Sequence, residues 1–282
     1  MTTDGIRKFA IYGKGGVGKS ITSSNISAAL SHMGYQVLQV GCDPKHDSIA
    51  TICGRLLPTI LEVVREKGLS QESIDSVIFK GYNGVWGCES GGPRPATGCA
   101  GKGVYTALEF LTRYKVPERF GANVVIYDVL GDVVCGGFSQ PMRHGYAKEI
   151  YMVGNGESLT LWQVNNVMKA VVRLRAGGSE VSVGGIIDNM RGVPNEEKVV
   201  EAFAEAIGVP VIMHVPRDKT VQQAEFQGKT VIEAFPDSPQ AGVYRELAKR
   251  IMANTKTYIP KVVTLPDIMR IVKGEMVAAA GR

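Results

Sequence analysis

Short apolar runs alternate along this chain with longer segments in which apolar residues recur every three or four positions. The short runs are rich in β-branched residues, which is typical of strands in a parallel sheet that is covered on both faces. We predict strands over residues 8–12, 36–41, 124–127, 150–153, 183–187 and 211–214. The intervening periodic segments predict helices over residues 19–32, 104–114, 161–174 and 196–207.

The alternation of strand and helix continues along residues 1–282 without a linker, a low-complexity tract or an internal repeat. It predicts a single α/β domain, doubly wound around one mostly parallel sheet. Two stretches break the pattern: residues 79–103, which are dense in glycine and proline, and the tail 258–282. A glycine-rich segment of that length in a compact domain is usually functional, because it buries little apolar surface.

The composition narrows the class of protein. With 44% hydrophobic and 21% charged residues, the chain resembles an ordinary globular protein. The net charge of +5 is spread along the sequence, which gives little support for a nucleic-acid partner. No apolar run approaches the roughly 20 residues that span a bilayer, and the polar N-terminus has no signal-peptide core. We therefore expect a cytoplasmic protein with no membrane partner.

In that reducing compartment the odd number of cysteines argues against structural disulfides. Each cysteine is then either a small buried residue or a metal ligand. No CxxC pair occurs, which disfavours a self-contained zinc or ferredoxin site within one chain. The five cysteines are Cys42, Cys53, Cys88, Cys99 and Cys135.

A phosphate-binding loop is the strongest local motif. The sequence GKGGVGKS matches G-x-x-x-x-G-K-[ST] directly between a predicted strand and a predicted helix, which is the context of a P-loop NTPase. We expect its backbone N–H groups to converge on phosphate oxygens, Lys19 to approach the β and γ phosphates, and Ser20 to bind Mg²⁺. The expected ATP-binding loop comprises Gly13, Lys14, Gly15, Gly16, Val17, Gly18, Lys19, Ser20 and Ile21.

Aspartates follow two of the predicted strands at the same edge of the sheet. Asp128 ends the apolar strand NVVIYD, where a carboxylate can reach the water shell of the metal. Asp43 and Asp47 lie just beyond the second strand. Each could instead be a helix cap or a turn residue. Lys14 could reach a phosphate bound by a neighbouring copy of the chain, or it could be a solvated surface lysine.

Cys99 in GCAGKG and Cys135 in VLGDVVCGGF have glycines on both sides, which would admit a bulky inorganic group. Two thiolates do not complete a four-iron cluster, whereas a twofold dimer with this pair on its axis would supply four. Considered alone, the pair fits buried structural cysteines equally well.

The chain resembles the iron protein of nitrogenase and its nitrogenase-like relatives over nearly its whole length. The motifs YGKGGVGKS, VGCDPKHDS, CESGGP, GCAGKG, YDVLGDVVCGGF and VPRD match in order. The resemblance implies a homodimer that holds one [4Fe-4S] cluster through Cys99 and Cys135. It further implies that MgATP hydrolysis drives single-electron transfer to a larger catalytic component, with ferredoxin or flavodoxin as the electron source.

The same resemblance assigns roles to individual residues. It implies that Lys14 acts across the dimer and that Asp43 and Asp47 respond to the γ phosphate. In the tail, an apolar face favours docking onto the protein's own dimer over an amphipathic membrane helix; it comprises Leu265, Ile268, Met269 and Val272. The resemblance gives no ligand role to Cys42, Cys53 or Cys88. The segment that links nucleotide to cluster would begin with Asp128 and Asp132, and the base would be surrounded by Asn189, Pro216, Arg217 and Asp218.

Three departures narrow the subgroup. Ile21 stands where nitrogenase usually has threonine, and His46 looks more like the dark-operative protochlorophyllide and chlorophyllide reductases. Lys102 replaces the arginine beside the first cluster ligand, so the docking charge survives but ADP-ribosylation of that arginine is not expected. This mosaic best resembles the methylthio-alkane reductase branch, followed by nitrogenase or a tetrapyrrole reductase.

Two other classes of protein compete with this interpretation. A partition or cell-division positioning ATPase shares the two-lysine loop and dimerises on ATP, but contains no cluster. A scaffold for iron–sulfur assembly usually carries a CxxC motif, which this chain lacks. A cluster signal in protein purified without oxygen would separate the predicted electron donor from the positioning ATPase.

Overall fold

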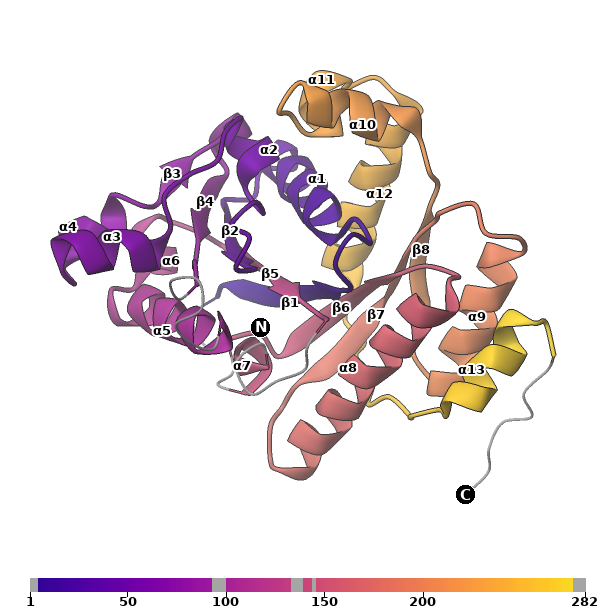
Figure 1. The fold of residues 1–282 in the computed structure, drawn as a ribbon. Coiled ribbons are helices and arrows are strands. Elements are labelled where there is room, and N and C mark those ends of the chain that lie inside the picture. Colours follow the sequence, from indigo (N-terminus) through magenta and orange to yellow (C-terminus); the bar gives the residue numbers. More distant parts are fainter. Residues whose placement is uncertain (1–4, 93–99, 133–138, 144–145, 276–282) are drawn as a thin grey trace.

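The computed structural model describes residues 5–92, 100–132, 139–143 and 146–275, which surround one eight-stranded sheet (Figure 1). The strand order is β3-β4-β2-β5-β1-β6-β7-β8, and neighbouring strands run parallel apart from the antiparallel pair β3 and β4. The strands are β1 (Arg7–Gly13), β2 (Val37–Cys42), β3 (Phe79–Lys80), β4 (Trp86–Glu89), β5 (Val124–Leu130), β6 (Glu149–Gly154), β7 (Ser182–Asn189) and β8 (Val211–Val215).

Strand β1 lies in the middle of the sheet, and the sheet separates the hydrophobic core into two halves. Because successive side chains point to opposite faces, Phe9 and Ile11 enter one hydrophobic core while Ala10 and Tyr12 enter the other. Strand β1 pairs with β5 on one side and with β6 on the other. Strands β2 to β5 lie on one side of β1, and β6 to β8 lie on the other. This reversal of strand order opens a crevice at the carboxyl ends of the strands, where doubly wound sheets bind their ligands.

Helices cover both faces of the sheet (Figure 1). One face carries α1 (Lys19–His32), α2 (Ala50–Cys53), α10 (Lys219–Phe226), α11 (Val231–Ala234) and α12 (Pro239–Ala253). The other carries α3 (Ile60–Lys67), α4 (Gln71–Asp75), α5 (Ala100–Arg113), α6 (Val116–Arg119), α7 (Gln140–Arg143), α8 (Ser158–Ala176), α9 (Glu196–Ile207) and α13 (Leu265–Val272). A short 3₁₀ turn, η1 (Tyr82–Gly84), precedes β4.

The predicted α/β fold with a mostly parallel, doubly wound sheet is confirmed, and each of the predicted strands and helices is present. Two details of the prediction are wrong. The stretch 79–103 is not wholly irregular, since it contains β3, β4 and the start of α5. Asp128 does not end its strand, because the apolar residues Val129 and Leu130 extend β5 beyond it.

The tail folds back onto its own chain in the described residues. Helix α13 begins with a capping box between Thr264 and Asp267, and it packs on α8 and α9. Ile268 and Ile271 are buried against this chain, whereas Leu265 and Met269 are 41% exposed. Docking of the tail in a dimer remains a prediction. Within the described ranges, no helix is both long and apolar enough to cross a membrane.

Candidate functional site

The loop between β1 and α1 needs glycine for two different reasons. Gly16 and Gly18 have φ values of 77° and 93°, in the left-handed region that disfavours other residues. A Cβ atom on Gly18 would lie 2.3 Å from the side-chain nitrogen of Asn189. That nitrogen instead donates a hydrogen bond of 2.7 Å to the carbonyl oxygen of Val17. Strand β7 therefore supports the loop directly at the point where phosphate would bind.

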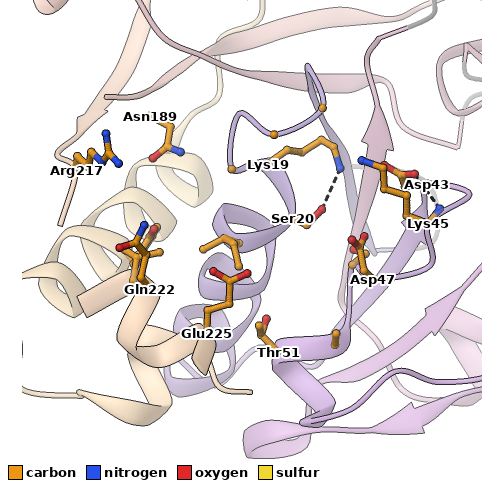
Figure 2. Close-up of a pocket in the computed structure, with 18 of the residues that line it drawn as sticks. Lys19, Ser20, Asp43, Lys45, Asp47, Thr51, Asn189, Arg217, Gln222 and Glu225 are labelled. Atoms are coloured by element: carbon orange, nitrogen blue, oxygen red, sulfur yellow. Dashed lines mark hydrogen bonds between the residues drawn. The ribbon is translucent and has the colours of Figure 1, made fainter. Parts of the chain in front are cut away.

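Lys19 is held in a buried ion pair at the base of the loop. Its Nζ lies 2.6 Å from Oδ1 of Asp128 and 3.2 Å from Oγ of Ser20, a contact drawn in Figure 2. Lys19 and Asp128 are 5% and 0% exposed. Burial alone would lower the pKa of Lys19, but Asp128, Asp43 and Asp47 outweigh it and raise the pKa. The ammonium therefore stays charged at neutral pH, as phosphate binding requires.

A buried network of neutral polar groups orients Asp128 from behind. Oγ of Ser48 donates to Oδ2 of Asp128 at 2.6 Å. The side-chain amide of Gln39 donates to both the carbonyl and the hydroxyl oxygen of Ser48 at 3.0 Å. Ser27 in turn donates to Oε1 of Gln39 at 2.7 Å. Because these groups are satisfied in the core, the segment that ends at Ser48 is tied to β5.

The predicted convergence of three aspartates at one edge of the sheet is confirmed. Asp43 and Asp47 line the same cavity as Lys19 and Ser20, and Figure 2 places both carboxylates on one side of that pair. Asp43 is 5% exposed, and its Oδ1 accepts a hydrogen bond of 3.0 Å from the backbone N–H of Lys45. These carboxylates are placed to contact a metal-bound triphosphate.

The cavity beside the loop has a volume of about 760 Å³, which suits a nucleotide. Its second wall comes from the ends of β7 and β8 and from α10 (Figure 2). The predicted base-binding residues Asn189, Pro216, Arg217 and Asp218 all line it. Sequence reasoning missed the further lining residues Lys45, Thr51, Arg55, Arg191, Val221, Gln222, Glu225 and Tyr244. The i, i+4 spacing of Val221 and Glu225 directly after VPRD was an available signal.

Some predicted binding residues support the cavity without lining it. Gly13 belongs to β1, and Val17 is 3% exposed in the hydrophobic core. Asp132 lies outside the cavity, where its carboxylate accepts from the backbone N–H of Gly15 at 2.8 and 3.0 Å. Gly131 also donates to the carbonyl of Gly13 at 3.0 Å. The phosphate loop is thus bonded to the segment that leads in sequence to Cys135.

Arg191 is a further cation beside the phosphate loop, and the sequence analysis did not single it out. Its guanidinium donates to the carbonyl of Gly16. The turn that carries Arg191 wraps around the carboxylate of Glu196, which is 3% exposed and accepts from the backbone N–H groups of Arg191, Gly192 and Val193. This arrangement holds a positive charge over the phosphate loop.

The predicted cluster ligands Cys99 and Cys135 lie outside the described residues. Burial of the other three cysteines disfavours the thiolate form. Burial raises the pKa of Cys42 and of Cys88, and burial also raises the pKa of Cys53 to about 11. Their prediction as core or loop thiols is confirmed by their burial. Cys99 and Cys135 remain the predicted cluster ligands.

Glu89 is a buried acid that the sequence analysis missed. Burial raises its pKa from 4.5 to about 8 against the lowering effect of the Ile49 N–H, and Asp128 and Asp47 raise it further. Because the pKa of Glu89 is higher in the folded chain than in the unfolded chain, the stabilising contribution of its carboxyl is complete at low pH. This contribution is lost as the pH rises from about 4.5 to about 8. Glutamine, which does not ionise, escapes this loss.

We therefore expect Glu89→Gln to gain stability relative to the natural protein as the pH rises. The gain in unfolding free energy between pH 5 and pH 8.5 should be roughly 2–5 kcal/mol. Urea unfolding of both proteins at a series of pH values measures it. Parallel pH profiles would show that Glu89 is ionised in the folded protein throughout the range.

Comparison with known proteins gives consistent matches. A model of 4Fe-4S iron sulfur cluster binding proteins, NifH/frxC family, matches residues 7–277. The nitrogenase iron protein of Methanospirillum hungatei is 46% identical over 270 residues, which is 95% of each chain. Nitrogenase iron protein 1 of Methanothermobacter thermautotrophicus is 46% identical over 269 residues, covering 95% of this chain and 97% of that one.

Solved structures share the fold at much lower identity. The septum site-determining protein MinD of Pyrococcus horikoshii, complexed with Mg-ADP, is 20% identical, with a TM-score of 0.66. The match covers 88% of this chain and 96% of that one. At this level of identity the likeness concerns the arrangement of strands and helices alone.

Proposed function

Because the chain belongs to the NifH/frxC family of 4Fe-4S iron–sulfur cluster binding proteins, we propose that it is the ATP-dependent reductase component of a nitrogenase-like system. Two copies of the chain hold one [4Fe-4S] cluster between them. Hydrolysis of MgATP is coupled to the transfer of single electrons to a larger catalytic protein. Ferredoxin or flavodoxin resupplies the electrons in the cytoplasm.

The observation that best supports this proposal is the link between the phosphate loop and the segment before Cys135. The carboxylate of Asp132 accepts the N–H of Gly15 at 2.8 Å, and β5 places Asp128 on Lys19 at 2.6 Å. One short segment thus contacts the nucleotide site at two points and then leads in sequence to a proposed ligand. A change at the phosphates is thereby passed along the backbone toward Cys135.

In the proposed reaction the chain's own groups bind and orient the nucleotide. Lys19 and the loop N–H groups bind the phosphates, and Ser20 and Asp128 hold the magnesium ion directly or through its water. Asp43 and Asp47 sense the γ phosphate from the loop after β2. Lys14 of one subunit stabilises charge at the phosphates of the other, and Cys99 and Cys135 supply thiolates to the cluster, which provides a one-electron redox centre.

The catalytic partner that we propose is a methylthio-alkane reductase, followed by nitrogenase or a tetrapyrrole reductase. Three sequence departures support this order, and the structure gives their positions. Ile21 lines the nucleotide cavity, and His46 adopts a φ of 46° in the loop between Asp43 and Asp47. Lys102 is exposed on the first turn of α5, where a positive charge suits docking.

Purification without oxygen tests the proposal. The protein should contain about four iron atoms per dimer, and an iron chelator should remove them at a different rate with MgATP than without it. A pull-down of the native complex should then retain larger catalytic subunits. Protein without iron would favour the positioning ATPase, and equal chelation rates would contradict the coupling of nucleotide to cluster.

A lysine-to-glutamine change at Lys14 tests the action across the dimer. Lys14→Gln should bind MgATP within about threefold of the natural protein and hydrolyse it at least roughly a hundredfold more slowly, because the lost charge acts chiefly in the transition state. Nucleotide titration and phosphate release measure the two effects. Lys219→Gln removes a charge from the exposed rim of the same cavity and should change hydrolysis little.

A further inference from the structure

The side chain of Glu89 connects two segments that are far apart in the sequence. It lies at the end of β4, is 1% exposed, and accepts the backbone N–H of Ile49 through Oε1 at 2.8 Å. Its second oxygen is also buried and has no hydrogen-bond partner in the described part of the chain. Such a group is costly to bury, so packing around the carboxyl must hold it there.

The packing comes from the end of β2. A Cβ atom on Gly41 would lie 1.8 Å from Oε2 of Glu89, so glycine is needed for the carboxyl to cross this strand. The N–H of Ser90 donates to the carbonyl of Gly41 at 2.8 Å. Glu89 therefore packs against β2, which precedes Asp43, and its side chain accepts a hydrogen bond from Ile49.

Residues 90–92 lie between α5 and the loop after β2, residues 43–49, which we call the nucleotide loop. A Cβ atom on Gly92 would lie 3.5 Å from the Cβ of Pro44, so the segment also lies beside the nucleotide loop at this second point. A Cβ atom on Gly103 in α5 would lie 3.4 Å from the carbonyl oxygen of Gly91. Because the segment 89–92 lies so close to α5, a shift of this segment would displace the first turn of α5.

Helix α3 braces the same segment. The N–H of Leu61 donates to the carbonyl of Ser90 at 3.3 Å, and the guanidinium of Arg65 donates to the carbonyl of Gly92 at 2.6 Å. Helix α5 begins at Ala100, immediately after Cys99 in the sequence. The segment 89–92 thus contacts the nucleotide loop at one end and α5, which follows the proposed ligand Cys99, at the other.

We propose that Glu89 is a positioning residue that couples the nucleotide loop, residues 43–49, to the first turn of α5 through the segment 89–92. This coupling is additional to the one through Asp132, and it rests on the proposed function for its link to the cluster. When Asp43 and Asp47 move with the γ phosphate, the bond from Ile49 to Glu89 passes the movement to β4. The two routes reach Cys99 and Cys135 separately.

Hydrogen exchange with and without a slowly hydrolysed MgATP analogue tests the coupling. In the natural protein, amides in residues 45–52 and in residues 101–106 should both change their exchange rates. In Glu89→Ala, which has no acceptor for Ile49, residues 45–52 should still respond, while the change in residues 101–106 should fall at least about fivefold. Glu89→Gln keeps an oxygen acceptor in a side chain of the same shape, and both responses should survive.

Two further arms make the test decisive. Glu89→Asp shortens the side chain by one methylene, so it should lose the α5 response even if Glu89→Ala does not fold. In protein loaded with iron, the effect of MgATP on chelation should weaken in Glu89→Ala and Glu89→Asp and persist in Glu89→Gln. Full α5 responses in Glu89→Ala or Glu89→Asp would overturn the proposal. Natural protein without iron would instead refute the proposed function, and the exchange result would still decide the coupling.

Discussion

Replacing Lys19 by methionine should abolish ATP hydrolysis and lower the free energy of unfolding by about 3–5 kcal/mol. Hydrolysis should be lost because the ammonium that we propose to bind the β and γ phosphates is gone. Stability falls because Asp128, which is 0% exposed and lies 2.6 Å from Lys19 Nζ, is left as a buried charge without its cation. Phosphate release and urea unfolding at pH 7 measure the two effects.

The matched control for this change is the double variant Lys19→Met with Asp128→Asn. Neutralising both partners removes the unpaired charge, so stability should return to within about 1 kcal/mol of the natural protein while hydrolysis stays absent. The double variant thus separates the electrostatic role of the pair from its catalytic role. If Lys19→Met were as stable as the natural protein, Asp128 would have to be protonated or hydrated in the folded chain.

Serine in place of either Cys99 or Cys135 should reduce the iron content from about four atoms per dimer to nearly none. In the proposed arrangement each substitution removes two of the four thiolates, because every residue occurs twice around the dyad. Iron analysis and visible absorption of oxygen-free protein measure the loss. Nucleotide binding should persist, since the cavity is built from other residues.

Cys53→Ala is the control for these variants. Cys53 is half-buried at the end of α2, burial raises its pKa to about 11, and it has no predicted role in the cluster. This variant should retain the full iron content. Iron retained in both serine variants would require other ligands and would remove the basis for the shared cluster.

The sequence was informative wherever structure depends on neighbours along the chain. Helix α9 was predicted at both ends, because Val199, Val200, Phe203 and Ile207 share one apolar face. The phosphate loop was equally clear, since its glycines and Lys19 act through local backbone geometry. The broad fold followed from the alternation of such elements.

What the sequence missed depends on contacts between distant segments. Strand β4 has only four residues, and its Gly87 and Glu89 interrupt any apolar run, so the sequence pattern predicts part of a loop there. Helix α12 was also missed, although Ser238 and Pro239 are recognisable start signals. The burial of Glu89 and its bond to Ile49 arise only when β2 and β4 pair.

The contact between Lys19 and Asp128 also has a consequence for the order of loading. A triphosphate that draws the ammonium away leaves a carboxylate stripped of its counter-ion in a dry site. A divalent cation that arrived alone would be repelled by the Lys19 ammonium, which already occupies the position beside Asp128. Each ligand would therefore remove the obstacle to the other, and we expect metal and nucleotide to be taken up as one complex in an exchange of counter-ions.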